Sequence, residues 1–389
     1  MTDRAMVEIL QAIATTLGKL VAKSTLGQLV RCKLQRLYAA YEPFFPATFF
    51  AGGFAFDIAT LGRIDHWATL VQQGLFLLLT GSLLTYEAHF NVRGLPYPDW
   101  FEKHRGYYES LMHFLFGGLL SAYTIFYFKS SSLMTSAAFM LFLAALLVVN
   151  EYPIFRKQGL PVKFLLFSLC IASFFSYLVP IFWGSIGVAT FTVSICLSLL
   201  TTSLFLKAIT RNVHLSLRTA RHLLAPALSV QILFSGLYYL GALPPVPLSV
   251  PYIGIFHDVE RRGDTFFLYH ENPFWRFWHN GDQEFAAREN DRIYGYARIF
   301  SPTNFADEVF IRWLYKASSG KWLTSDLIQM SITGGRQEGF RGYTYKDNYD
   351  TGEWQMRVET ADGRELGRIY FEVREDRREG QRSFRTIES

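Results

Sequence analysis

The stretch that decides the fold is Leu111–Glu151, which reads LMHFLFGGLLSAYTIFYFKSSSLMTSAAFMLFLAALLVVNE. It holds two apolar runs, Leu111–Phe128 and Leu133–Asn150, joined by Lys129 and three serines. Neither run contains Asp, Glu, Lys or Arg. Eighteen helical residues rise about 27 Å, which is close to the roughly 30 Å thickness of a bilayer's hydrocarbon core. The pattern therefore predicts a transmembrane helical hairpin and places the chain among membrane proteins.

Seven apolar runs of spanning length occur in the first two thirds of the chain. They cover residues 44–64, 67–86, 110–128, 132–150, 163–183, 187–206 and 223–243. Aromatic side chains gather near their ends, as they do where amphipathic rings lie at headgroup level. The sequence therefore predicts a seven-helix transmembrane domain over residues 43–243, in which Gly52–Gly53 and Gly117–Gly118 let helices approach closely.

The charge of the connecting segments predicts the orientation of these helices. If the N-terminus is cytoplasmic, the segments on that side carry sixteen Lys and Arg, whereas the opposite segments carry only Arg63 and Lys129. Lys and Arg accumulate in cytoplasmic loops, so we expect the N-terminus inside the cell. Seven crossings then place the region after residue 243 in the periplasm, on the outer side of a bacterial inner membrane.

Residues 1–42 are predicted to form a cytoplasmic amphipathic helical segment. Apolar side chains recur at three- and four-residue spacing from Met6 to Leu20, and positive charges accumulate toward Arg36. Such a helix either lies on anionic lipid or docks on the bundle or on a second copy of itself. The sequence leaves both interpretations open.

Charge and cysteine content narrow the range of functions. The chain has a net charge of +5, but residues 1–257 carry +8 and residues 258–389 carry −3. The positive charge belongs to the membrane half and accompanies its orientation, so we expect no nucleic-acid partner. Cys32, Cys170 and Cys196 all lie in that half, which leaves the C-terminal region without a disulfide framework or a cysteine zinc site.

Residues 244–257 are predicted to be a linker. The segment is rich in proline, with Pro244, Pro245, Pro247 and Pro251 within eight residues. Closely spaced prolines favour an extended, semi-rigid chain. We therefore expect a spacer that holds the following domain at a fixed distance from the bilayer.

Residues 258–376 have the pattern of an all-β domain. Apolar and polar residues alternate in several short segments, and Ser318–Gly320 and Asp362–Gly363 are turn signals. The predicted strands cover 266–271, 292–300, 309–316, 322–333, 340–346, 354–359 and 369–373. About seven short strands without a convincing helix predict an antiparallel β-sandwich with Trp313 and Trp354 in its core. Residues 377–389 are predicted to be a charged, frayed tail.

Several of these segments are similar to a known family. Ala51–Asp57 (AGGFAFD), Leu61–Asp65 (LGRID), Phe114–Ser131 and Val149–Glu151 resemble an uncharacterised family of bacterial multi-pass inner-membrane proteins. Members of that family end in a soluble domain of unknown function. The segments similar to that domain are Trp313–Tyr315, Gly334–Arg336 and Gly352–Trp354. The resemblance implies an envelope location and a two-part architecture, and it implies no activity.

Asp57 is the leading candidate site residue in the helices. It is the one carboxylate well inside a predicted span, and such a group usually faces the bundle interior with a partner. One interpretation is an ion, proton or ligand site in the outer half of the bundle, joined by Arg63 or Lys129. The other is a buried ion pair or hydrogen-bond acceptor that fixes helix packing.

A second group of titratable residues gathers at the cytoplasmic ends of the predicted helices. It comprises Glu87, His89, Glu102, His104, Glu109, His113 and Glu151. Glu109 and His113 lie four residues apart on one helix face, and carboxylate with imidazole suits zinc or iron. No HExxH or Glu-x-x-His pattern accompanies them, so metal binding is the weaker alternative and we expect no metal and no cofactor.

Two segments of the β region carry candidate binding residues. Trp275 and Trp278 fall outside the strand pattern, so they dock on a membrane surface, on a glycan or on an edge of the domain's own sheet. Arg336 and Arg341 flank a glycine-rich stretch that suits a carboxylate or a phosphate if it forms an irregular loop. Otherwise the stretch is an ordinary turn with solvated arginines.

The sequence favours a non-enzymatic role, since it lacks the common catalytic and nucleotide-binding motifs. The preferred hypothesis is an inner-membrane protein whose periplasmic β-sandwich binds an envelope component, whether glycan, lipid or protein. A second hypothesis is transport or lipid handling through a polar site around Asp57. A third is an envelope sensor that acts with a cytoplasmic partner.

Overall fold

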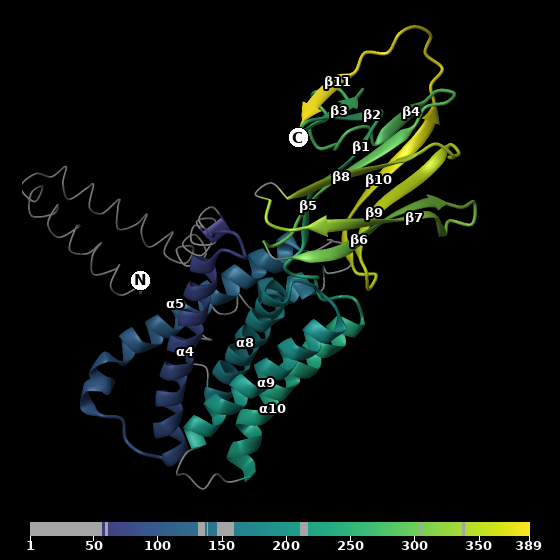
Figure 1. The fold of residues 1–389 in the computed structure, drawn as a ribbon. Helices are drawn as coiled ribbons and strands as arrows, with labels where there is room; N and C mark the ends of the chain where they lie inside the picture. Colours follow the sequence, from purple (N-terminus) through teal and green to yellow (C-terminus); the bar gives the residue numbers. More distant parts are fainter. Residues whose placement is uncertain are drawn as a thin grey trace, which may run out of the picture.

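The computed structural model describes residues 57–58, 61–130, 137, 139–145, 159–210, 217–303, 305–336 and 339–389. These residues form a group of helices below and a β region above, joined end to end (Figure 1). The described helices are α4 (Trp67–Arg93), α5 (Asp99–Lys129), α8 (Leu160–Trp183), α9 (Val188–Thr210) and α10 (Leu217–Tyr239). The predicted N-terminal segment 1–42 lies outside the described residues.

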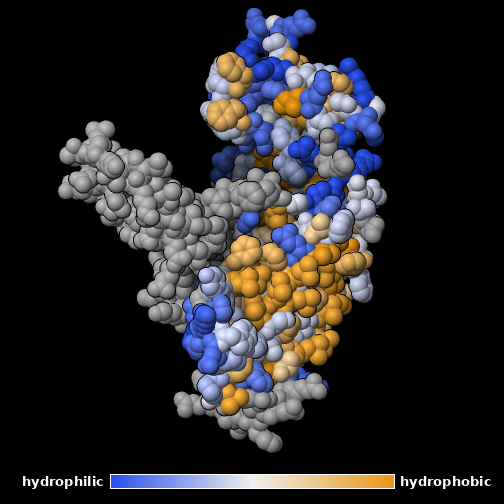
Figure 2. Space-filling model, turned by 90° about the vertical axis from the view of Figure 1, so that its left-hand side faces the viewer, coloured by the Kyte–Doolittle hydropathy of each residue, from blue (hydrophilic) through white to orange (hydrophobic). Residues whose placement is uncertain are grey.

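Four of the helices are long and apolar enough to cross a membrane. These segments are Trp67–Asn91, Tyr107–Lys129, Leu160–Trp183 and Val188–Ile209. They confirm that four of the predicted runs are helices of spanning length, and Figure 2 shows apolar side chains covering much of the face of the helical half that is in view. The apolar part of α10, Ala227–Tyr239, is shorter than a span. The predicted runs 44–64 and 132–150 lie mostly outside the described residues, so the count of seven stays a prediction.

Helix α8 is the centre of the bundle and packs against α4, α5, α9 and α10. It is apolar on all sides, which is typical of a helix enclosed by others. Small residues bring the neighbouring helices close. A Cβ atom on Gly81 of α4 would lie 2.4 Å from the ring of Phe205 and 2.7 Å from that of Phe167, and one on Gly118 of α5 would lie 3.0 Å from Phe76. Close contact at Gly118 agrees with the sequence prediction.

Two predicted helix ends differ from the structure. The first run was expected to continue to residue 64, but residues 61–63 have no regular secondary structure. The last run was expected to reach residue 243, but α10 ends at Tyr239. Gly241 then adopts a φ of 66° and donates its N–H to the carbonyl of Tyr238. A left-handed glycine closes the helix at no steric cost, so the chain turns before the apolar run is finished.

The proline-rich segment is not a spacer, so that prediction is wrong. Residues 243–249 are all buried. Leu243 and Val246 belong to the core of the bundle, and Leu248 belongs to the core of the β region. Strand β1 (Ser249–Phe256) follows at once. Proline carries no N–H, so such a segment passes between two apolar cores while leaving few donors unpaired.

The β region contains eleven strands among the described residues. After β1 come β2 (Asp258–Arg262), β3 (Thr265–His270), β4 (Glu284–Ala287), β5 (Ile293–Phe300), β6 (Ala306–Lys316), β7 (Trp322–Thr333), β8 (Phe340–Lys346), β9 (Gly352–Thr360), β10 (Glu365–Glu375) and β11 (Arg385–Glu388). They form three sheets, ordered β1-β5-β8, β4-β10-β9-β6-β7 and β11-β3-β2. The seven predicted strands correspond to β3 and β5–β10, while β1, β2, β4 and β11 were missed.

One apolar core lies between the first two sheets. It takes alternate residues from β1 and β5 and from β6, β9 and β10, including Trp313 and Trp354, as predicted. The Trp313 indole donates to Thr344 Oγ1 at 3.2 Å. Most pairs are antiparallel, but β10 and β4 run parallel, which departs from the purely antiparallel prediction. Side-chain alternation gives the buried face of a strand and not the direction of its neighbour.

The C-terminal tail is ordered in part, so the prediction of a frayed end is wrong. Strand β11 pairs antiparallel with β3 along residues 385–388. Arg382, whose side chain is 9% exposed, lies 2.7 Å from Asp291 and 3.3 Å from Asp376. Arg378 also pairs with Asp376, at 2.7 Å. These ion pairs anchor the charged segment to the β region.

Candidate functional site

The β region is attached to the bundle by contacts at three places besides the chain connection. At the first, between α8 and α9, the N–H of Ala306 donates to the carbonyl of Gly184 at 3.0 Å. The N–H of Ile186 donates to Asp307 Oδ2 at 3.0 Å. Ile186 also packs against the core of the β region. The start of β6 is therefore held directly on the end of the helices.

The second attachment uses Tyr238 near the end of α10. Its ring stacks on Phe191 with centroids 3.8 Å apart, and its hydroxyl donates to Asp362 Oδ2 at 3.3 Å. The guanidinium of Arg364 lies 4.6 Å from the centre of the same ring. Asp362 and Arg364 lie in the predicted turn between β9 and β10, so this turn is bound to the helices.

The third attachment includes Arg63, a predicted site residue. Its guanidinium binds Asp65 through two hydrogen bonds of 3.0 and 2.8 Å and lies 5.1 Å from the centre of the Phe300 ring. Thr303 donates to the same carboxylate at 3.3 Å. The charge of Arg63 is therefore compensated by Asp65, and the pair links the segment before α4 to the end of β5.

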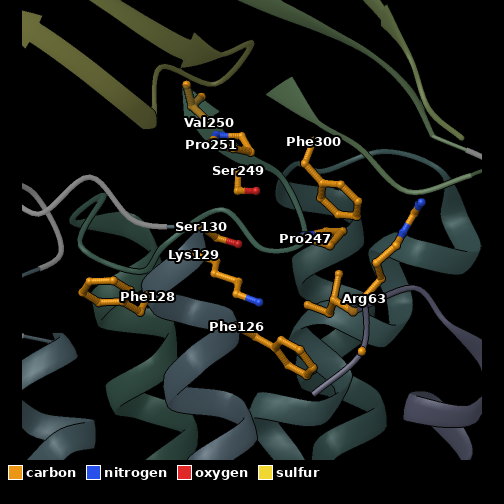
Figure 3. A pocket seen from close by; sticks show the side chains of 12 residues that line it. Arg63, Phe126, Phe128, Lys129, Ser130, Pro247, Ser249, Val250, Pro251 and Phe300 are labelled. Atoms are coloured by element: carbon orange, nitrogen blue, oxygen red, sulfur yellow. The ribbon is translucent and has the colours of Figure 1, made fainter. Parts of the chain in front are cut away.

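A cavity of about 530 Å³ lies beside this third attachment. Its wall is formed by residues 62–64, the C-terminal end of α5, the segment 247–251 and Phe300 (Figure 3). Its volume falls within the range of small-ligand sites, roughly 300–1,000 Å³. The two cations predicted for the outer side, Arg63 and Lys129, both line it.

Asp57 has a partner on α5. Its carboxylate accepts a hydrogen bond of 2.5 Å from the hydroxyl of Ser121, which is buried. Ser121 lies eight residues before Lys129, about 12 Å along the helix, so Asp57 is placed deeper in the bundle than the cavity. Asp57 does not line the cavity with Arg63 and Lys129.

The group proposed as a metal alternative does not form a metal site within the described residues. Glu87 binds Lys163 of α8 at 2.7 Å and accepts a hydrogen bond of 2.9 Å from Tyr108. Glu109 faces Arg105 at 3.4 Å. Across the described part of the chain no group of three or more His, Cys, Asp or Glu is placed to hold a metal ion. The structure gives no support to a site made of Glu87, His89, Glu109 and His113.

Trp275 and Trp278 lie on two consecutive turns between β3 and β4. The N–H of Arg276 donates to the carbonyl of Pro273, and that of His279 donates to the carbonyl of Arg276. The two central residues of each turn are aromatic and point outward, with exposed fractions of 74% for Phe274, 59% for Trp275, 84% for Phe277 and 61% for Trp278. Within each turn the rings meet edge to face. We call Phe274–Trp278 the aromatic turn pair.

Polar contacts hold the aromatic turn pair in place. The amide of Asn272 donates to the carbonyl of Arg276 at 3.2 Å, and the Arg276 guanidinium lies 3.0 Å from Glu284 on β4. The Arg385 guanidinium lies 5.9 Å from the centre of the Phe274 ring. These contacts hold the backbone of the two turns, while the four rings stay exposed to solvent.

A buried His–Asp pair lies beneath these turns. Asp282 accepts two hydrogen bonds of 3.0 Å from the N–H of Glu271, and its carboxylate lies 3.7 Å from His257 Nε2. Burial is the main cause that raises the pKa of Asp282 to about 7 and lowers the pKa of His257 to about 4. Both shifts favour the neutral forms, as expected for groups removed from water.

Arg336 and Arg341 lie on different elements, which the sequence did not predict. Arg336 is exposed in the connection between β7 and β8. Arg341 lies within β8, with its guanidinium 5.7 Å from the centre of the Phe266 ring. A strand residue over an aromatic ring is not part of an irregular anion-binding loop, so the structure gives no support to an anion site shared by the two.

Comparison with protein families matches residues 306–373 to the family described as protein of unknown function (DUF2914). This match covers strands β6 to β10 and agrees with the predicted C-terminal domain of unknown function. A search of curated proteins returned no match.

Solved structures that share features with the chain are only distantly similar. An immunoglobulin-like protein from Pseudomonas aeruginosa matches with 12% identity and a TM-score of 0.20, covering 33% of this chain and 98% of that one. A β-glucosidase from Kluyveromyces marxianus matches with 11% identity and a TM-score of 0.18, covering 32% and 14%. The DNA glycosylase AlkC from Pseudomonas fluorescens matches with 11% identity and a TM-score of 0.19, covering 78% and 98%. Scores this low carry no argument about fold or function.

Sequence reasoning singled out two of the four rings in the aromatic turn pair and missed Phe274 and Phe277. The repeat of two aromatics at 274–275 and at 277–278 was the available signal, because the Asn272–Pro273 dipeptide marks a turn or loop. The sequence also gave no indication that Ser130 and Ser249 line the same cavity as Lys129. No local pattern joins residues 120 positions apart.

Proposed function

We propose that this chain is a multi-pass inner-membrane protein that presents a periplasmic β-sandwich to the cell envelope and binds an envelope glycan through the aromatic turn pair. The four exposed rings of Phe274–Trp278 are the observation that carries this proposal. Contiguous exposed aromatic surface on a soluble region is a common mark of a binding site. The two sheets that share one core support the sandwich, and four spanning-length helices support the membrane anchor.

The position of the aromatic turn pair favours a target away from the anchoring bilayer. The turn before Glu365 contacts the bundle at Tyr238, and β10 runs from there away from the helices (Figure 1). Glu284, which holds Arg276, lies beside Glu372 of β10. Seven residues of strand place this point about 23 Å farther along β10. The rings therefore lie beside the part of β10 that is remote from the contact with the bundle.

A glycan suits the chemistry of this surface. Sugar rings have an apolar face and a rim of hydroxyl groups. Flat indole and phenyl faces match the apolar side, and the guanidinium of Arg276 and the carboxylate of Glu284 lie beside them to bind hydroxyls. The connection through residues 243–249 is buried and short, so the β region holds the rings in a fixed direction relative to the bilayer.

Co-sedimentation with purified peptidoglycan tests this function. The full chain in detergent is expected to bind, and the Trp275→Ala/Trp278→Ala double variant is expected to bind at least tenfold more weakly, since exposed aromatic anchors dominate such contacts. Trp100→Ala is the matched control, because Trp100 is 60% exposed but lies at the first turn of α5.

Binding by the wild type that is unchanged in the double variant would refute the assignment to these rings. No binding to the glycan, combined with specific capture of an envelope protein through Trp275 and Trp278, would replace the glycan with a protein partner.

Transport or lipid handling around Asp57, and sensing with a cytoplasmic partner, remain the alternative functions. The hydrogen bond from Ser121 gives Asp57 a structural partner, which favours a role in helix packing. Asp57→Asn that abolishes activity while full amounts of folded protein remain would favour the alternative of a site in the bundle.

A further inference from the structure

The cavity at the end of α5 has the features of a site for an anionic headgroup. It lies where the spanning-length segment Tyr107–Lys129 ends and where the β region begins. If the helices are embedded as proposed above, this level coincides with the headgroups of the outer leaflet. The cavity therefore lies where a lipid headgroup is available without leaving the bilayer.

Three hydrogen-bond donors line this cavity. Figure 3 shows the ammonium of Lys129 and the hydroxyls of Ser130 and Ser249 directed to the same side, toward Pro247. Ser130 is 2% exposed and Ser249 is 7% exposed. Neither hydroxyl has a hydrogen-bond partner among the described residues. Neither oxygen is among the fully buried side-chain atoms that lack a partner, so both hydroxyls open into the cavity and can donate to a ligand there.

Lys129 supplies the positive charge that an anionic ligand of this cavity would need. Among the residues that the structure describes, no carboxylate lies within ion-pair distance of its ammonium. Arg63, the other cation of the cavity, is already bound by Asp65, and Figure 3 shows its guanidinium directed away from the three donors. One uncompensated ammonium with two hydroxyls matches the oxygens of a single phosphate diester.

The rest of the wall is apolar and continues toward the bilayer. Phe126 and Ile64 are buried, while Phe128 is exposed at the outer face of α5. A free phosphate ion would make no favourable contact with this apolar wall. An acyl chain would lie along it and continue down the exposed side of the helix. Hydrogen-bond donors at one end of the cavity and aromatic side chains toward the helices together favour a complete lipid molecule over a free phosphate ion as the ligand.

We propose that this cavity binds the phosphate headgroup of an anionic phospholipid, with Lys129, Ser130 and Ser249 holding the phosphate. This proposal rests on the proposed membrane embedding and is independent of the aromatic turn pair. It makes the lipid a ligand of the junction at which Arg63, Asp65 and Thr303 attach the β region. The bound headgroup would then complete the polar contacts at this junction.

Native mass spectrometry of the full chain in detergent, titrated with phosphatidylglycerol, tests the proposal. The wild type is expected to retain phosphatidylglycerol in preference to phosphatidylcholine. Lys129→Gln should weaken this retention about tenfold, because it removes one charge-assisted contact, and Lys129→Arg should restore most of it. Ser249→Ala should weaken it a few-fold. Lys103→Gln, on the first turns of the same helix and outside the cavity, should have no effect.

Equal retention by wild type and Lys129→Gln would overturn the proposal. Equal losses in Lys129→Gln and Lys103→Gln would also overturn it, since they would reflect general attraction between cations and anionic lipid. Displacement of the lipid by millimolar inorganic phosphate would show that the site takes free phosphate instead. The Trp275→Ala/Trp278→Ala variant should retain lipid normally, so failure of glycan binding and failure of lipid binding are separate results.

Discussion

The bundle and the β region expose opposite kinds of surface around similar apolar cores. Leu78, Leu200 and Ile232 on the helices are more than half exposed. The β region exposes charged side chains, such as Lys316 and Glu353, which form an ion pair of 2.7 Å. Figure 2 shows a largely hydrophilic surface over this half. Exposed leucine costs little only if the surroundings are as apolar as the side chain. The difference supports the proposal that the two halves face different solvents, lipid for the bundle and water for the β region.

The sharpest test of this comparison puts the same charge on both surfaces. Leu200→Arg on α9 should cost about 3 kcal/mol, because a guanidinium would enter the hydrocarbon. Leu327→Arg on β7, at a leucine of similar exposure, should change stability by no more than about 0.5 kcal/mol. The yield of monodisperse protein after detergent extraction measures both. Equal yields for the two variants would contradict the comparison.

Ion pairs should also differ between the two halves. Lys163 and Glu87 are each 13% exposed, whereas Lys316 and Glu353 are 35% and 58% exposed. Lys163→Met should destabilise the bundle by about 2–3 kcal/mol, because it leaves a largely buried carboxylate without its cation. Adding Glu87→Gln should recover much of this loss.

The matched change in the β region is Lys316→Met, which should cost about 0–1 kcal/mol. Thermal unfolding in detergent reports both pairs. Equal melting-temperature losses in Lys163→Met and Lys316→Met would mean that the end of the bundle is as well hydrated as the β surface.

The buried His–Asp pair predicts a pH dependence that belongs to the β region alone. Between an unfolded pKa of about 3.9 and the folded value of about 7, the folded state keeps a proton on Asp282 that the unfolded state releases. The contribution of Asp282 to stability is therefore present at low pH and lost as the pH rises through 7. His257 acts in the opposite direction, since its lowered pKa removes stability as the pH falls from about 6.5 toward 4.

The Asp282→Asn variant lacks the pH-dependent contribution of Asp282 to stability and keeps that of His257. The melting temperature of the variant minus that of the wild type should become more positive from pH 5 to pH 8, by an amount equivalent to about 2 kcal/mol. A difference that stays constant over this range would show that the Asp282 carboxyl titrates as in water.

The smallest expected effect concerns the attachment of the two halves. Tyr238→Phe removes one hydrogen bond of 3.3 Å to Asp362 and keeps the stacking on Phe191. The expected loss is about 1 kcal/mol. Hydrogen exchange should rise in the Thr360–Arg364 turn and stay unchanged in β7. Unchanged exchange in the turn would mean that Tyr238 contributes only packing.

The sequence predicted the elements that carry a strong local signal. Long apolar runs gave α4, α5, α8 and α9, because a helix in lipid must satisfy its backbone within itself. Alternation gave the buried faces of β6, β9 and β10 and placed Trp313 and Trp354 in the core. Short strands such as β4 and β11 were not predicted, since four residues carry too little alternation and their pairing depends on distant partners.

The candidate sites divide in the same way. Trp275 and Trp278 were identified from the sequence because tryptophan outside a strand pattern is conspicuous within one segment. The cavity depends on Lys129 and Ser249, which are 120 residues apart, and on the burial of a proline-rich segment that local pattern reads as an exposed spacer.

The sequence by itself determined that this chain has an apolar helical half and a charged β half, because solvent preference is a property of each side chain. Only the tertiary structure decided that the two halves meet without a spacer, that Arg63 is compensated by Asp65 while Lys129 lines an open cavity, and that four aromatic rings share one outward surface. Contacts of this kind join segments far apart in the chain, and their free energy appears only when folding brings those segments together.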